Sequence, residues 1–168
     1  MVVGILTNNS NKYPKRKQNR LHGFDYSSVG DYFITICTKN RINIFWKDDF
    51  NSDLAIAKSY TELLSPIGKI AHSVIQRTDS VYNNKIKVDK FVIMPNHIHI
   101  IYSIYEPMYS VSSIVMQLKR RICIESKNSD IWQKGFYDHV IRCDKDYNEM
   151  WDYIDANPRK YTNKIFLD

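Results

Sequence analysis

Two histidines separated by one residue are the first candidates for chemistry in this sequence of 168 residues. His97 and His99 lie in a segment that predicts a β-strand, in which alternate side chains point to the same face, about 7 Å apart at their Cα atoms. Two neutral imidazoles at that separation can bind one divalent metal ion. The pattern is short, and two unrelated strand histidines are the alternative. The turn predicted at Pro95 and Asn96, directly before the pair, favours a site.

A tyrosine on the polar side of the last predicted helix is the second candidate. The apolar residues of this helix recur at helical spacing and predict the face that packs on a sheet: Tyr147, Met150, Trp151 and Ile154. A second face of the helix, about 100° away, carries polar residues and one tyrosine: Asp146, Glu149, Tyr153 and Asn157. Tyr153 therefore lies one helical turn from both Glu149 and Asn157. This placement favours a use for its hydroxyl, although a half-buried tyrosine at a helix shoulder would give the same pattern.

The chemistry that these side chains would support is an attack on a phosphodiester. Tyrosine can act as a covalent nucleophile, but its free pKa of about 10 requires a metal-polarised phosphate or a nearby base at neutral pH. His97, His99 and the carbonyl oxygen of the Asn157 side chain would supply three ligands for Mg²⁺ or Mn²⁺, with water and a phosphate oxygen completing the shell. Because Pro158 follows Asn157, we expect Asn157 at the end of the helix. Its direct contact with the metal stays open.

The elements that position these residues are predicted in the order β-α-β-β-α-β-α. Runs rich in β-branched and aromatic residues predict strands over 31–38, 86–94, 97–103 and 136–142. Helices are predicted from Pro66 to about Arg77 behind the N-cap Ser65, from Ser112 or Ser113, and from about Lys145 to Ala156, with Pro158 ending the last one. This order is typical of a ferredoxin-like α+β fold, an antiparallel sheet with helices on one face.

The net charge of +6 and the isoelectric point of about 9.1 favour polyanionic partners. Basic residues gather in an arm predicted over residues 1–22 and on the second predicted helix. The candidates for phosphate contacts are Lys15, Arg16, Lys17, Arg20, Lys119, Arg120 and Arg121. Each of them, taken singly, is equally well explained as a solvated surface charge.

One domain is expected over residues 23–168, after the basic arm. No apolar run reaches the length of a membrane span, and the N-terminus lacks the pattern of a secretory signal. We therefore expect a cytoplasmic protein without membrane contact. Three widely separated cysteines predict neither a disulfide framework nor a zinc site.

Five stretches that occur in a fixed order between residues 15 and 161 carry a family pattern. They cover residues 20–26, 32–41, 92–99, 132–142 and 153–158, and the third contains the segment Met-Pro-Asn-His-Ile-His. In this order they resemble the REP-associated tyrosine transposases, relatives of the single-tyrosine HUH transposases. The resemblance implies an HUH fold that acts on single-stranded DNA, typically on a hairpin.

The resemblance also implies roles for individual residues. His97 and His99 would be the metal ligands, and Tyr153 the nucleophile that forms a 5′-phosphotyrosine and leaves a free 3′-hydroxyl. Asn157 matches the polar residue four positions after the nucleophile, which is often glutamine in relatives and one methylene longer. His139 matches a family histidine. Either it has a catalytic or DNA-positioning role, or it is a structural strand histidine. Glu149 is a further candidate for support of the site.

Two other functions remain open at this point. One is a nickase of the same superfamily that serves replication or mobilisation, although no helicase or primase segment accompanies the domain. The other is a ferredoxin-like module that binds nucleic acid without cutting it, which predicts no metal dependence. The sequence leaves open whether the protein is a monomer or a homodimer, which DNA sequence it recognises, and whether it mobilises its own element or serves the host.

Overall fold

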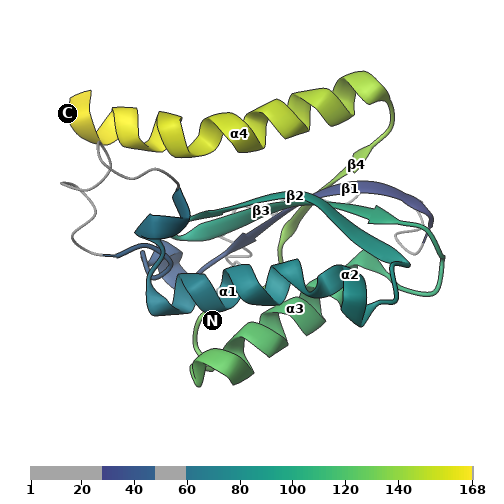
Figure 1. Ribbon diagram of the computed structural model, residues 1–168, viewed down its shortest axis with the longest axis horizontal. Coiled ribbons are helices and arrows are strands. Elements are labelled where there is room, and N and C mark those ends of the chain that lie inside the picture. Colours follow the sequence, from purple (N-terminus) through teal and green to yellow (C-terminus); the bar gives the residue numbers. More distant parts are fainter. Residues whose placement is uncertain (1–27, 48–59, 168) are drawn as a thin grey trace, which may run out of the picture.

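The computed structural model describes residues 28–47 and 60–167, and these form an antiparallel sheet with helices on both faces (Figure 1). The elements follow the predicted order. They are β1 (Gly30–Cys37), a 3-10 turn at Lys39–Arg41, a second one at Tyr60–Leu63, α1 (Pro66–Gln76), the short α2 (Thr78–Val81), β2 (Ile86–Met94), β3 (His97–Ile104), α3 (Val111–Ser126), β4 (Tyr137–Ile141) and α4 (Asp144–Leu167). The predicted basic arm, with Lys15, Arg16, Lys17 and Arg20, lies outside the described residues.

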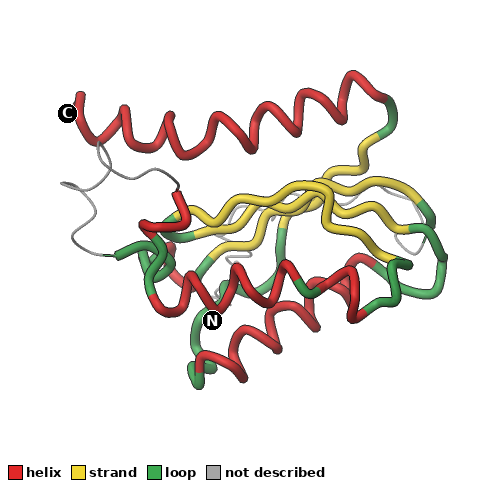
Figure 2. The backbone as a smooth tube through the Cα atoms, in the orientation of Figure 1, coloured by secondary structure: helices red, strands yellow, loops and turns green. Residues whose placement is uncertain are grey.

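The sheet has the strand order β2-β3-β1-β4, and every neighbouring pair is antiparallel. The α+β class and all four predicted strands are confirmed, with ends that differ by one residue or less. A tight turn at Pro95 and Asn96 joins β2 to β3, so that Met94 pairs with His97. Figure 2 shows the four strands crossing the molecule as one layer.

The expectation that all helices cover one face was wrong. α1, α2 and α3 cover one face, while α4 crosses the opposite face (Figure 1). The first face is mostly apolar, and Tyr32, Ile34, Ile98 and Ile100 on it are fully buried. Asp138 of β4, opposite Ile34, is a buried polar residue on this face. The second face also carries buried apolar residues, such as Ile101, and a single helix suffices to cover them. Each face of a sheet that bears apolar side chains requires a covering layer.

α1 begins as the sequence predicts. The Ser65 hydroxyl accepts a hydrogen bond from the Gly68 amide at 3.1 Å, and Pro66 occupies the first turn. Gly68 packs directly on the loop after β1, because a Cβ atom there would lie 2.0 Å from the Phe45 carbonyl oxygen. α3 begins at Val111, slightly earlier than predicted, because Ser110 supplies the N-cap and accepts from Ser113.

The prediction that Pro158 ends the last helix was wrong, since α4 continues to Leu167. A proline inside a helix removes one N–H donor, which costs about 3 kcal/mol. Packing beyond the proline offsets this cost: the Tyr161 ring meets Trp46 edge-on, with centroids 5.6 Å apart. Before the proline, Asp155 pairs with Lys90 of β2 at 2.6 Å. Tertiary contacts on both sides of Pro158 thus hold the helix on the sheet.

No helix in the described part of the chain combines the length and apolar character needed to cross a membrane.

Candidate active site

A cavity of about 890 Å³ lies between α4 and the sheet face that it covers. Strands β1, β3 and β4 form its floor, and α4 forms its roof. The residues that line it are Phe33, Thr35, Cys37, Arg41, His97, His99, Tyr137, His139, Asp146, Glu149, Met150, Tyr153 and Asn157. Six of the residues singled out in the sequence are therefore brought together in one place: His97, His99, His139, Glu149, Tyr153 and Asn157.

The two strand histidines project from β3 into this cavity with their rings 4.7 Å apart. Ile98, between them, points to the opposite face and is fully buried. The alternation of side chains in a strand thus separates the polar pair from the core, as the sequence predicts. His99 is only 4% exposed, and its ring stacks on Phe33 at 5.2 Å.

A hydrogen-bonded asparagine fixes the orientation of His97. The Asn96 amide nitrogen donates to the Arg41 carbonyl oxygen at 3.2 Å and to the Asn43 side-chain oxygen at 3.0 Å. The Asn96 oxygen is thereby turned towards His97 Nδ1, at 2.8 Å. A carbonyl oxygen can only accept, so Nδ1 carries the proton and Nε2 keeps a free lone pair.

A threonine orients the ring of His99. Thr35 lies directly opposite His99 in the sheet, and its hydroxyl is 2.8 Å from Nδ1. The other ring nitrogen, Nε2, is buried and has no hydrogen-bond partner within the described residues. A buried polar atom without a partner is costly, and a metal ion at Nε2 would satisfy it. The two Nε2 atoms therefore fit a divalent cation.

Both histidines are neutral at physiological pH. Burial lowers the pKa of His97 to about 4, and the positive charge of Arg41 lowers it further. Burial also lowers the pKa of His99 to about 3, with smaller contributions from His97 and Arg41. A neutral imidazole is the form that binds metal ions, and no proton has to be displaced near pH 7.

Tyr153 reaches the histidine pair from α4. Its ring meets His99 edge-on, with centroids 5.2 Å apart, and meets Phe33 at 5.8 Å. The side chain is still 42% exposed, so its hydroxyl is open to a ligand. Tyr147 differs, because it does not line the cavity. Burial, followed by the charge and hydrogen bond of Asp89, raises the pKa of Tyr147 to about 12.

Asn157 lines the same cavity one helical turn after Tyr153. The expectation that it lies at the helix end was wrong, because α4 continues past it. Its amide nitrogen donates to the Tyr153 carbonyl oxygen at 3.1 Å, which leaves its own oxygen to accept or to ligate. Within the described residues no third His, Cys, Asp or Glu completes a metal-binding group. A third protein ligand would therefore be the Asn157 oxygen or a group outside these residues.

His139 stands on β4 and is paired with an aspartate of α4. Its Nε2 atom lies 2.9 Å from both carboxylate oxygens of Asp146. This contact orients the ring through Nε2 and leaves Nδ1 as the ring nitrogen that can meet another partner. Glu149 also lines the cavity, but it is largely solvated and lies 3.9 Å from Lys145.

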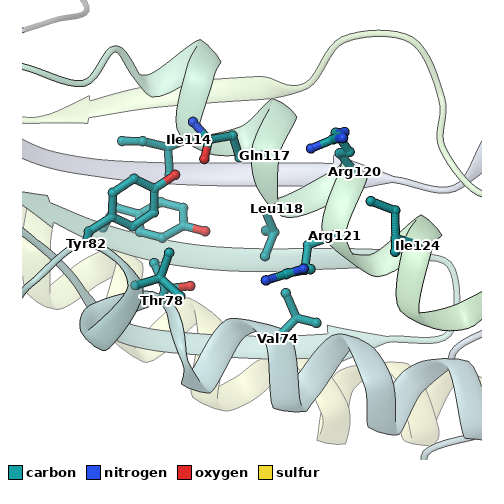
Figure 3. A pocket seen from close by; sticks show the side chains of 11 residues that line it. Val74, Thr78, Tyr82, Ile114, Gln117, Leu118, Arg120, Arg121 and Ile124 are labelled. Carbon is teal, nitrogen blue, oxygen red and sulfur yellow. The ribbon is translucent and has the colours of Figure 1, made fainter.

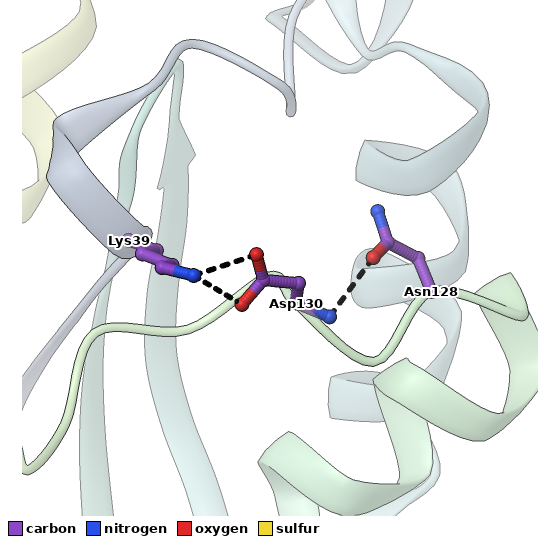
Figure 4. A network of polar contacts seen from close by, with 3 residues as sticks. All are labelled: Lys39, Asn128 and Asp130. Atoms are coloured by element: carbon purple, nitrogen blue, oxygen red, sulfur yellow. Dashed lines mark hydrogen bonds and ion pairs between the residues drawn. The ribbon is translucent and has the colours of Figure 1, made fainter.

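The site also contains Arg41, Thr35 and Asn96, which were not predicted from the sequence as site residues. Arg41 has a left-handed backbone (φ 57°), and it points into the cavity from the turn after β1. Figure 4 shows how this turn is anchored: Lys39 reaches both carboxylate oxygens of Asp130 at 2.7 Å. Only the sheet register places Thr35 opposite His99. Asn96, adjacent to His97, was interpreted only as a turn residue.

The basic residues of α3 do not form one surface near this cavity. α3 lies on the other face of the sheet (Figure 1). The Lys119 ammonium donates to the carbonyl oxygens of Gln133 and Gly135 at 2.9 and 2.6 Å, and burial lowers its pKa. Arg121 lies 3.5 Å from Glu125. Lys119 therefore has a structural contact, and the predicted DNA contacts of all three residues stay predictions.

Comparison with known proteins identifies relatives along most of the chain. A REP-associated tyrosine transposase of Escherichia coli K12 is 33% identical over 136 residues, which cover 81% of this chain and 70% of that protein. An uncharacterized protein of Haemophilus influenzae is 30% identical over 168 residues, covering 85% of this chain and 88% of that protein. A putative REP-associated tyrosine transposase of the same organism is 27% identical, covering 82% and 74%.

Among solved structures, a REP-associated tyrosine transposase bound to a REP hairpin has the same fold. Its TM-score is 0.58 at 21% identity, and the match covers 84% of this chain and 74% of that one. No family model matches the sequence.

Proposed function

Because this chain belongs to the REP-associated tyrosine transposase family, we propose that it cuts single-stranded DNA and transfers the cut strand through a covalent bond to Tyr153. The observation that carries the proposal is the contact between the Tyr153 ring and His99, whose Nε2 atom has no partner among the described residues. A solvent-open phenol and a pair of neutral imidazoles share one cavity.

His97 and His99 would hold a Mg²⁺ or Mn²⁺ ion through their Nε2 atoms, with the Asn157 oxygen as the third protein ligand. When bound, this ion polarises the phosphodiester and offsets the negative charge that develops on it. The protein supplies orientation. Asn96 accepts from His97 Nδ1, and the Thr35 hydroxyl is hydrogen-bonded to His99 Nδ1, so both contacts direct Nε2 towards the metal position. Phe33 supports the His99 ring.

The chain's own residues carry the covalent step. The Tyr153 oxygen forms a bond to phosphorus, and the bond between phosphorus and the 3′ oxygen breaks. The 5′ side stays attached to Tyr153, and the other strand ends in a free 3′-hydroxyl. The phenol proton passes to His139 Nδ1, and solvent water supplies the proton that the departing 3′ oxygen takes up. The phosphotyrosine bond conserves the energy of the phosphodiester, so the reverse attack reseals or exchanges strands without ATP.

The proposal also assigns a role to Arg41 and a DNA substrate to the protein. Arg41 presents a guanidinium group to the cavity and is placed to contact the phosphate. The solved relative is bound to a REP hairpin, which supports a DNA hairpin as the substrate of this chain as well. The net charge of +6 favours such a polyanion.

A cleavage assay with labelled hairpin oligonucleotides tests the proposal. We expect a covalent protein–DNA adduct with Mg²⁺ or Mn²⁺, none with EDTA, and none with Tyr153→Phe. Tyr147→Phe is the matched control, on the same helix but outside the cavity, and should keep the adduct. A protein that binds hairpins equally well with EDTA and with Tyr153→Phe, and never cuts them, would be the binding module instead.

A further inference from the structure

A second cavity lies on the far side of the sheet from the candidate active site. It has a volume of about 240 Å³ and opens between α1, α2 and α3 (Figure 3). Its walls are apolar where the helices face each other, at Val74, Leu118 and Ile124. Tyr82 closes one end, and Tyr102 of β3 belongs to its lining. Protein interiors are normally packed to high density, so an apolar cavity of this size is a candidate binding site for a ligand.

The lining contains a polar group that the fold does not satisfy. The Tyr102 hydroxyl is completely buried, and it has no hydrogen-bond partner within the described residues. Burial raises the pKa of Tyr102, so the hydroxyl stays protonated and remains a donor. A buried donor without an acceptor is destabilising. An acceptor oxygen carried by an occupant of the cavity would remove this penalty.

The mouth of the cavity is positively charged. Arg120 and Arg121 reach it from adjacent positions of α3 (Figure 3). Glu125 is already shared, because both of its oxygens bind Arg77 at 2.8 and 2.9 Å while Arg121 lies 3.5 Å away. Arg120 makes no ion pair within the described part of the chain. Glu125 thus shares its charge between Arg77 and Arg121, and it is not paired with Arg120 at the same mouth. An oxyanion bound there would balance the excess positive charge.

We propose that this cavity binds a small organic anion, with its carboxylate or phosphate at Arg120 and Arg121 and its apolar body between Val74 and Leu118. The Tyr102 hydroxyl is covered by lining side chains in the free protein, and these shift as an acceptor oxygen at the inner end of the ligand reaches it. The volume suits a molecule on the order of ten non-hydrogen atoms, since an apolar cavity of about 150 Å³ holds benzene. The lining of this cavity shares no residue with that of the candidate active site.

A set of matched para-substituted benzoates tests the three contacts, with calorimetry and methyl NMR of the full chain. 4-Acetylbenzoate carries both an anion and an inner acceptor. 4-Isopropylbenzoate lacks the acceptor, and 4-acetylbenzamide lacks the charge. We expect saturable binding of 4-acetylbenzoate with shifts at Val74, Leu118 and Ile124, and about tenfold weaker binding of each analogue. Phenyl phosphate, in a separate titration, distinguishes a phosphate-bearing ligand from a carboxylate.

Variants separate a built site from adventitious binding. Arg120→Gln should weaken 4-acetylbenzoate about tenfold, whereas Lys69→Gln removes a charge from α1 outside the cavity and should leave binding unchanged. Tyr102→Phe should weaken 4-acetylbenzoate but not 4-isopropylbenzoate, and should not destabilise the free protein. Equal losses with Arg120→Gln and Lys69→Gln would overturn the proposal. So would an absence of binding by every small anion while a short oligonucleotide shifts the same methyl signals.

Discussion

Replacement of Asn96 tests how the metal site is preorganised. Asn96→Ala removes the acceptor that holds the proton on His97 Nδ1 at 2.8 Å. Without it, the proton can move to Nε2, the nitrogen that would bind the metal. One hydrogen bond contributes about 1 kcal/mol, and the loss of a residue that orients a metal ligand typically lowers metal affinity about 10- to 100-fold. Only one of the three proposed protein ligands is affected here, so we expect a loss of about tenfold.

Two measurements follow from this change, and neither depends on cleavage. Long-range ¹H–¹⁵N NMR of the metal-free protein should show His97 protonated on Nδ1 in the wild type and shifted towards Nε2 in Asn96→Ala. Titration with Mn²⁺, followed by electron paramagnetic resonance, should show the weaker binding. Asn96→Asp is the matched variant, because it keeps an acceptor opposite Nδ1, and it should retain most of the affinity.

Replacement of Asn43, a hydrogen-bond partner of Asn96, is a control with a smaller expected effect. Asn43→Ala takes away one of the two acceptors of the Asn96 amide but leaves the Arg41 carbonyl. Its effect on Mn²⁺ affinity should therefore be smaller than that of Asn96→Ala. If Asn96→Ala leaves both the tautomer of His97 and the Mn²⁺ affinity unchanged, Asn96 is only a turn residue and the reasoning fails.

Three further predictions concern pH, proton transfer and packing. The pKa values of His97 and His99 in the folded protein lie below the ordinary value of 6.5. The free energy of unfolding of the metal-free protein should therefore be at its full value above about pH 6.5 and should fall towards pH 4. The fall should reach up to about 1.4 kcal/mol per pH unit for each histidine. Chemical denaturation at several pH values should show this slope, and His97→Gln should flatten it. His139→Gln should slow single-turnover cleavage about a hundredfold while leaving hairpin affinity intact, whereas a rate near that of the wild type would exclude His139 as the proton acceptor. Gly68→Ala should destabilise the fold by about 3 kcal/mol in urea unfolding, because its Cβ atom would collide with the Phe45 carbonyl; an unchanged midpoint would show that the loop can move away.

Much of this fold could be predicted from patterns in short stretches of the sequence. The alternation of side-chain directions along a strand placed His97 and His99 on one face of β3. The helical spacing of apolar residues placed Tyr153 outside the apolar face of α4. Ser65 and Pro66 marked the start of α1 for the same reason. These patterns depend on residues only a few positions apart.

Features that depend on distant contacts could not be predicted in this way. Pro158 predicts a helix end, but α4 continues beyond it because Tyr161 packs on Trp46. The pairing of Thr35 with His99 depends on the sheet register, and the approach of Arg41 depends on a left-handed turn. Likewise, Lys119 reads as a surface charge, but its ammonium group binds two carbonyl oxygens of a loop that follows in the chain.

The most direct test is to identify the amino acid that becomes attached to DNA. A hairpin substrate would be cleaved in the presence of Mn²⁺, the adduct digested with protease and nuclease, and the modified peptide sequenced by mass spectrometry. We predict a nucleotide attached to the phenolic oxygen of Tyr153, in the peptide that precedes Asn157. A nucleotide on Tyr147 or on any other residue would contradict it.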